Sequence, residues 1–105
     1  MSSNRLLFRN RLEEIVGDSV KKLYFQPPEN LKLEFPCIVY DMADVKIQKA
    51  DNLPYTLHKQ FTVTVIDKNP DSDIYEHILN GFEYASFDRS FKSDNFNHFV
   101  LTIYW

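Results

Sequence analysis

Two stretches of this chain place large apolar side chains at a period of two residues, which is the period of a β-strand. In residues 61–65 the Phe and Val side chains take the odd positions and two Thr take the even ones, which predicts a half-buried strand. In residues 99–105 large apolar groups occupy both sets of positions, so both faces of that strand should be covered. The chain must therefore bury a sheet. Its last strand is either central in that sheet, or covered by helices on one face and by another subunit on the other.

A helix is predicted over residues 3–17, because four apolar side chains recur there at helical spacing and Gly17 is placed to end it. The face of this helix is formed by Phe8, Leu12, Ile15 and Val16. Its arginines, Arg5, Arg9 and Arg11, lie largely elsewhere and should be exposed.

A second helix should begin near residues 69–73, where Asp71 or Ser72 can cap the free backbone amides of its first turn. Gly81 marks its C-terminal end. The apolar stripe of this helix is formed by Ile74, Ile78 and Phe82, supported by Tyr75 and Leu79.

The remaining segments are predicted to form strands and the connections between them. A short strand over residues 20–26 is stopped by two prolines, a second strand covers 37–47, and residues 84–92 pair with the last strand through a turn at 92–95. Residues 48–57 form a connection longer than an ordinary hairpin loop. The element order is α-β-β-β-α-β-β, which predicts an α+β fold: a mainly antiparallel β-sheet with two helices packed on one face.

The length and the net charge exclude several classes of protein. The 105 residues (12.5 kDa) with 44% hydrophobic residues predict one ordered domain over residues 1–105. The net charge of −3 gives no general reason to bind nucleic acid, and no apolar stretch is long enough to span a bilayer, so we expect a soluble protein. The charge is uneven: residues 1–22 carry five basic groups against three acidic, whereas residues 66–105 carry three basic groups against seven acidic. Head-to-tail packing of copies could use this asymmetry, although two solvated faces explain it as well.

Catalytic motifs are missing from the sequence. The two glycines stand far apart, so the known phosphate-cradling loops cannot be assembled. Cys37 has apolar neighbours and reads as a small buried hydrophobe, and the chain holds no second cysteine for an internal disulfide. His58, His77 and His98 stand on different elements, and Asp73 with His77 reads as a surface pair at i, i+4. We therefore expect no enzyme, no metal, no cofactor and no small-molecule substrate.

Several blocks of the chain, taken in order, resemble the tail-completion proteins of long-tailed bacteriophages, also called tail terminator or tail-to-head joining proteins. The resemblance covers roughly residues 10–105. Its blocks are Gln26-Pro27-Pro28-Glu29-Asn30, Phe35-Pro36-Cys37-Ile38-Val39-Tyr40, Ala50-Asp51-Asn52-Leu53-Pro54-Tyr55, Phe61-Thr62-Val63-Thr64-Val65-Ile66-Asp67, Pro70-Asp71-Ser72, Ser86-Phe87-Asp88-Arg89 and Asn97-His98-Phe99-Val100.

The resemblance implies a structural virion protein. Such proteins form a ring, commonly a hexamer, that caps the finished tail tube and presents a surface to the head-tail connector protein. The implied partners are further copies of the chain, the tail tube protein and the connector, with passive contact with DNA in the channel as an open question. The implied location is the head-tail interface of the virion, and the host cytoplasm during assembly. The alternatives are a head-side connector (head completion or minor capsid) protein of the same virus type and a small cytoplasmic binding module.

For a tail-completion protein, we expect subunit or tail-tube contacts at residues 48–57 and on the exposed face of the last strand. An ordinary surface loop explains the sequence of residues 48–57 equally well. The expected contact residues are Lys46, Lys49, Asp51, Asn52, Tyr55 and Lys59, with Tyr55 as an aromatic anchor and the lysines as a polar rim. Asp88 and Arg89 form either an intersubunit ion pair or a local pair within a turn. The arginines of the first helix either line a DNA passage or face acidic residues of a neighbour.

Overall fold

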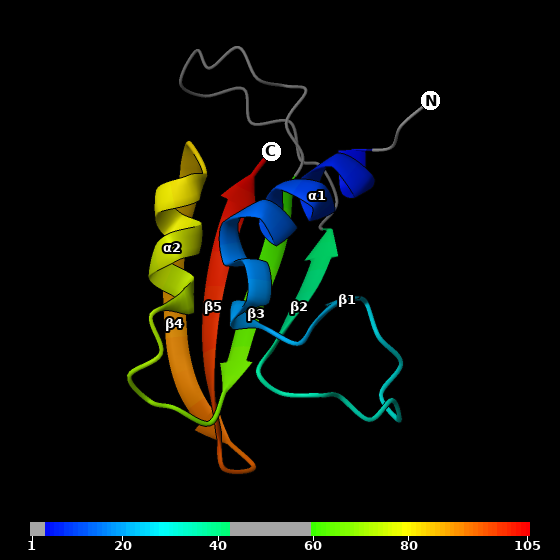
Figure 1. Cartoon of the computed structure of the whole chain (residues 1–105), viewed down its shortest axis with the longest axis vertical. Helices are drawn as coiled ribbons and strands as arrows, with labels where there is room; N and C mark the ends of the chain where they lie inside the picture. Colours follow the sequence, from blue (N-terminus) through cyan, green and yellow to red (C-terminus); the bar gives the residue numbers. More distant parts are fainter. Residues whose placement is uncertain (1–3, 43–59) are drawn as a thin grey trace.

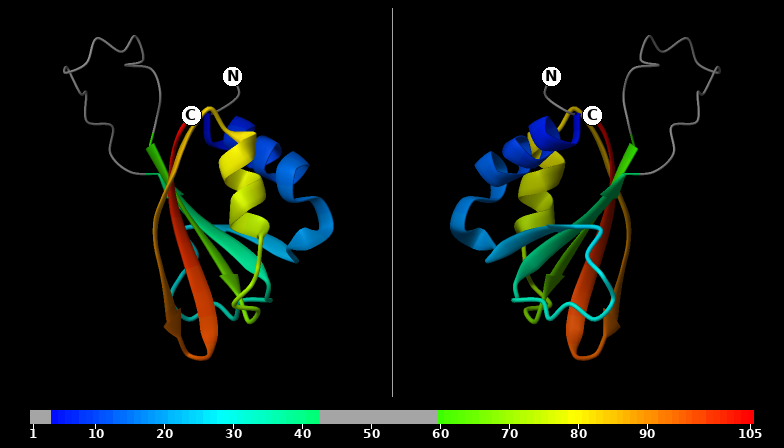
Figure 2. Two further views of the ribbon diagram at one scale, coloured as in Figure 1. Left: turned by 90° about the vertical axis from the view of Figure 1, so that its left-hand side faces the viewer. Right: turned by 90° about the vertical axis from the view of Figure 1, so that its right-hand side faces the viewer.

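A computed structural model describes residues 4–42 and 60–105. The described residues form a five-stranded sheet with both helices packed on the same face (Figure 1; Figure 2). The elements are α1 (Asn4–Val16), a short 3-10 turn η1 (Gly17–Ser19), β1 (Lys22–Phe25), β2 (Cys37–Met42), β3 (Gln60–Asp67), α2 (Ile74–Gly81), β4 (Tyr84–Ser93) and β5 (Phe96–Tyr104). This order and the single helical layer confirm the predicted α+β fold.

The strands lie in the order β1-β2-β3-β5-β4. β1 pairs with β2 in parallel, and the other three pairs are antiparallel, which confirms a mainly antiparallel sheet. β5 lies between β3 and β4, so it has a neighbour on each side. The last strand is therefore an inner strand, the first of the two arrangements that its apolar faces allowed.

The hairpin between β4 and β5 is tighter than the sequence indicated. Only Asp94 and Asn95 separate the strands, with φ values of 51° and 68°. Two residues with positive φ give a turn whose twist matches that of the flanking strands, and Asp and Asn tolerate this conformation better than most residues. This turn lets β4 extend over ten residues.

The core lies between the helices and one face of the sheet, and Phe8 is at its centre. Its ring stacks on Phe61 of β3 at 4.0 Å between centroids and lies 5.9 Å from Tyr40 of β2. Phe82 and Trp105 approach the same ring at 5.3 and 6.0 Å. One buried side chain of α1 thus contacts two strands, the residue that follows α2 and the end of the chain, as expected of the predicted apolar face.

The two glycines end their helices for different reasons. Gly17 has a φ of +52°, a conformation that other residues adopt at a cost, and α1 stops directly before it. Gly81 ends α2 with no positive φ; instead a Cβ there would overlap the side chain of Ile15, whose Cγ1 would lie 2.8 Å away. Gly81 therefore allows α2 to approach α1 closely.

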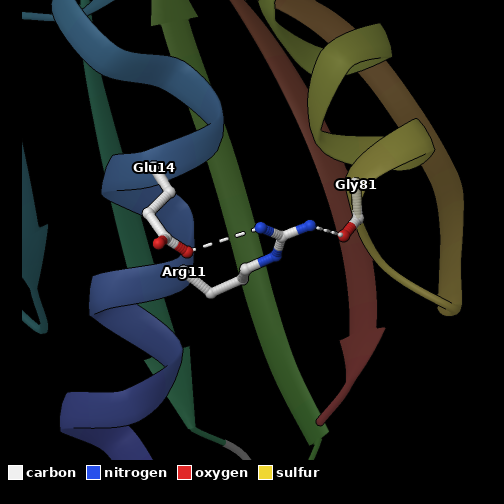
Figure 3. A network of polar contacts seen from close by, with 3 residues as sticks. All are labelled: Arg11, Glu14 and Gly81. Carbon is white, nitrogen blue, oxygen red and sulfur yellow. Dashed lines mark hydrogen bonds and ion pairs between the residues drawn. The ribbon is translucent and has the colours of Figure 1, made fainter.

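Arg11 joins the same two helices by a polar contact (Figure 3). Its Nη2 donates a hydrogen bond to the Gly81 carbonyl oxygen at 3.2 Å, and its Nη1 lies 3.4 Å from Glu14 Oε1. The carbonyl at the end of a helix has no partner within that helix, so a guanidinium placed there satisfies it and complements the helix dipole.

The start of α2 differs from the prediction. The helix begins at Ile74, and Asp73, rather than Asp71 or Ser72, takes the N-cap position without a side-chain capping bond. The preceding amides are satisfied by local turns: Asp67 accepts from the Asn69 N–H, and Asn69 accepts from the Asp71 N–H. The side chains of Asp67 and Asn69 thus form turns in the segment before the helix, and the helix begins after them.

Replacing Phe8 by Ala should lower the free energy of unfolding by about 3–5 kcal/mol, because the variant loses a fully buried ring and leaves a cavity. Phe91→Ala is the matched control, since that ring is 44% exposed and its removal should cost less than about 1 kcal/mol. Urea denaturation measures both values, and equal losses would contradict the central role of Phe8.

Gly81→Ala should lower stability by about 1–3 kcal/mol, because the added methyl group meets Ile15. In a background of Ile15→Ala the same change should be neutral or stabilising, since the space is free and Ala favours the helix. Thermal melts of the four proteins in this cycle test the contact, and an unchanged penalty in the Ile15→Ala background would refute it.

Candidate interaction surface

The face of the sheet that points away from the helices is called the open face here. The pairing register and the alternation of side chains place about half of the residues of β2 to β5 on it. They include Cys37, Val39, Thr62, Thr64, Ile66, Ser86, Asp88, Arg89, Phe91, His98, Val100 and Thr102. No described helix lies over this face (Figure 2).

One end of the open face is closed by local packing. Cys37, Ile66 and Val100 are buried although they point away from the helical core. Near this end, the ring of Phe35 stacks on Phe96 at 3.9 Å between centroids, and the Lys68 ammonium lies 5.6 Å from the Phe96 centroid. The region between β1 and β2 therefore contributes to the packing around the start of β5.

The part of the open face over β4 and β5 is exposed and carries both charge and aromatic surface. Phe91 stacks on His98 at 4.7 Å with the rings nearly parallel, and the Arg89 guanidinium lies 5.8 Å from the Phe91 ring. Asp88 accepts a hydrogen bond of 2.6 Å from the Thr102 hydroxyl. A polar and aromatic strip of this kind resembles the composition of protein interfaces.

Asp88 and Arg89 lie in the middle of β4, so the expected local pair within a turn is wrong. Among the ion pairs found in residues 4–42 and 60–105, none joins these two side chains. The carboxylate of Asp88 binds Thr102 and the guanidinium of Arg89 lies against Phe91. An intersubunit pairing of the two charges stays a prediction.

The remaining predicted contact residues, Lys46, Lys49, Asp51, Asn52, Tyr55 and Lys59, lie outside the residues that the structure describes, as does His58. The expected connection over residues 48–57 lies there too. Their proposed role is not altered by the fold.

The arginines of α1 have partners within the subunit. Arg9 lies 3.4 Å from Glu13, Arg11 bridges Glu14 and Gly81, and the Arg5 guanidinium lies 4.7 Å from the Phe25 ring. The side chains of Arg9 and Arg11 remain partly exposed, as predicted. Their charges are partly compensated by these local contacts, which weakens any field that they would direct at DNA.

Cys37 and His77, which were considered for catalysis, lie in different surroundings. Cys37 is fully buried, and burial raises the pKa of its thiol to about 11, so it is protonated at neutral pH. His77 Nε2 lies 3.4 Å from Asp73 Oδ2 on an exposed side of α2, which agrees with the predicted surface pair. Within the described ranges, no group of three or more His, Cys, Asp or Glu side chains could hold a metal ion. No described helix is long and apolar enough to cross a membrane.

The exposed aromatic residues of β4 are not among the contact residues predicted from the sequence; Tyr84, Phe87 and Phe91 are 46%, 43% and 44% exposed. Phe87 lies beside Tyr75 of α2, and Tyr75 in turn stacks on Phe99. Apolar and polar side chains alternate only weakly in residues 84–92. This is the pattern of a strand that exposes aromatic rings at the edge of a sheet, since such a strand has no clear apolar side.

Comparison of the chain with protein-family models, curated proteins and solved structures found no match. The interpretation of its surface therefore depends on the residues and contacts described above.

The Cys37 thiol should resist alkylation at about pH 8 in the native protein and react readily in denaturant. The raised pKa keeps the thiol protonated in the folded protein. The free energy of unfolding should therefore fall as pH rises above about 9, where the thiol of the unfolded chain ionises. Relative to Cys37→Ala, the unfolding free energy of the wild type should therefore decrease from about pH 8 to 11. Rapid labelling of the native thiol would contradict its burial.

Proposed function

We propose that this chain is a bacteriophage tail terminator, a structural protein that caps the completed tail tube as a ring and joins the tail to the head connector. The observation that carries the proposal is the resemblance of an ordered set of sequence blocks to tail-completion proteins. Four of the seven blocks lie on or enter strands that build the open face: residues 35–40 enter β2, residues 61–67 lie in β3, and residues 86–89 and 97–100 belong to the β4–β5 hairpin.

The form of the subunit supports an assembly role. A single layer of helices covers one face of the sheet, and the other face carries exposed polar, charged and aromatic groups over β4 and β5. Surfaces of this composition bind other proteins more readily than a uniformly charged surface does. A ring would use such surfaces head to tail between copies, and a further surface toward the tail tube.

The second candidate is a head-side connector or minor capsid protein of the same virus type. It would use the same kind of surface but would bind the portal side of the junction. The choice of partner distinguishes the two proteins, because a terminator binds tail tubes and a head-side protein binds filled heads.

The test is the mass of the protein by light scattering across a concentration series, alone and with purified tail tubes of a long-tailed phage. A terminator should form a ring by itself or on the tubes, and electron microscopy should show it at one tube end. A protein that ignores tubes but binds heads would be the connector, and one that ignores both would refute a virion role.

Deleting residues 49–54 should abolish ring formation or tail capping, because this segment is proposed to reach the neighbouring subunit or the tube. The matched control replaces Asp94 and Asn95, in the tight turn of the other hairpin, by glycines, which suit positive φ. Thermal melts should show both variants folded. Unchanged capping by the deletion variant would remove residues 49–54 from the contact surface.

A further inference from the structure

Among the described strands, β4 forms a long edge of the sheet with a neighbouring strand on one side only. Within residues 4–42 and 60–105 it pairs only with β5, at the edge of the sheet (Figure 1). It spans ten residues, and each of its side chains is exposed except that of Ala85, which is half-buried. An edge strand presents unpaired backbone N–H and C=O groups along its outer side, which favours pairing with another strand. The edge is also flanked by the exposed rings of Phe87 and Phe91.

The opposite edge of the sheet is less suited to strand addition. β1 is only four residues long. Glu34 is held beside it: its backbone N–H donates to the Tyr24 hydroxyl at 3.1 Å, and its carboxylate lies 3.4 Å from Lys22 Nζ. A second strand would therefore find its longest free pairing surface at β4.

A β-bulge divides β4 at its centre. Phe87 pairs with Leu101 and Arg89 pairs with Val100, so Asp88 is an extra residue between two consecutive partners. The extra residue shifts the alternation of side chains by one position. Asp88 and Arg89 consequently share the open face, as their contacts with Thr102 and with Phe91 show.

We infer that β4 pairs in antiparallel fashion with β4 of a second copy of this chain, with Asp88 opposite the partner's Arg89 and Arg89 opposite the partner's Asp88. The two-fold axis then passes between these residues, at the midpoint of the strand. A two-fold contact uses the same patch on both copies, so the patch must be complementary to itself. An acidic and a basic residue adjacent at the centre of the strand meet this condition.

The bulge allows residues that are opposite each other in this register to lie on the same face of the sheet. Opposite residues of an antiparallel pair must lie on the same face of the sheet, and a regular strand centred between two residues would place them on different faces. With the bulge, Phe87 meets the partner's Ser90 on the helix side, and Ser86 meets the partner's Phe91 on the open face. Each exposed ring therefore faces a small side chain rather than a second ring or a charge.

This dimer is distinct from the proposed ring. A ring closes through two different surfaces of each subunit, whereas the β4 contact is two-fold and joins two subunits or two rings. The inference depends on the register of β4 and on its charges, and it holds or fails independently of tail capping.

The test is the dimer dissociation constant, measured by sedimentation on the full chain and on three exposed-residue variants. Arg89→Asp alone and Asp88→Arg alone should each weaken the dimer about tenfold or more, because each places like charges opposite one another twice per dimer. Lys92→Glu is the matched control for Arg89→Asp: it makes the same change in net charge on the same strand but meets the partner's Ala85, and it should change the constant less than about twofold.

Mixing the two single variants provides the decisive measurement. In the mixture, the Asp88→Arg chain carries two cations and the Arg89→Asp chain two anions, so a heterodimer has both pairs restored and should form with near wild-type affinity. Circular dichroism should show that every variant is folded. A wild type that stays monomeric at millimolar concentration would overturn the inference, and the bulge would then protect the edge from pairing. Single variants that dimerise as tightly as the wild type, or a mixture that forms no heterodimer, would also overturn it.

Discussion

The stacking of Phe8 on Phe61 is the contact on which the rest of the fold depends, since it holds α1 against the sheet. The same ring contacts Phe82 and Trp105, so α2 and the end of β5 are joined to α1 through one aromatic cluster. The close approach of Gly81 to Ile15 and the bond from Arg11 to the Gly81 carbonyl become available once α1 is in place. Large aromatic rings suit this role because each buries much apolar area at little cost in side-chain entropy.

Placing both helices on one face determines which surface remains for partners. The arginines of α1 are used within the subunit, by Glu13, Glu14, Gly81 and Phe25, rather than arranged as a free basic surface. The exposed combination of charge and aromatic rings lies instead on β4 and β5. The tail-terminator proposal and the two-fold pairing of β4 both use this side of the molecule, but through different contacts. The first needs partners on the virion, and the second needs only another copy of the chain.

Periodicity was sufficient for most of the elements because burial imposes it directly. Phe8, Leu12 and Val16 recur at helical spacing and are all buried, and residues 61–65 alternate as a strand with one buried face. The start of α2 was harder to predict: Asp67 and Asn69 form turns with the backbone amides before it, and Asp73, rather than Asp71 or Ser72, takes the N-cap position. The contact residues predicted between positions 46 and 59 lie outside the described residues and stay predictions.

The sequence by itself determined the class of fold, the element order and the apolar faces, because these follow from the spacing of side chains along the chain. It also placed Asp88 next to Arg89 and Gly81 at the end of a helix. Only the tertiary structure decided what those residues do. Gly81 is required by the proximity of Ile15, and the bulge opposite β5 directs Asp88 and Arg89 to one face. Both effects arise from segments distant in sequence that meet in space, and local periodicity carries no information about which segments meet.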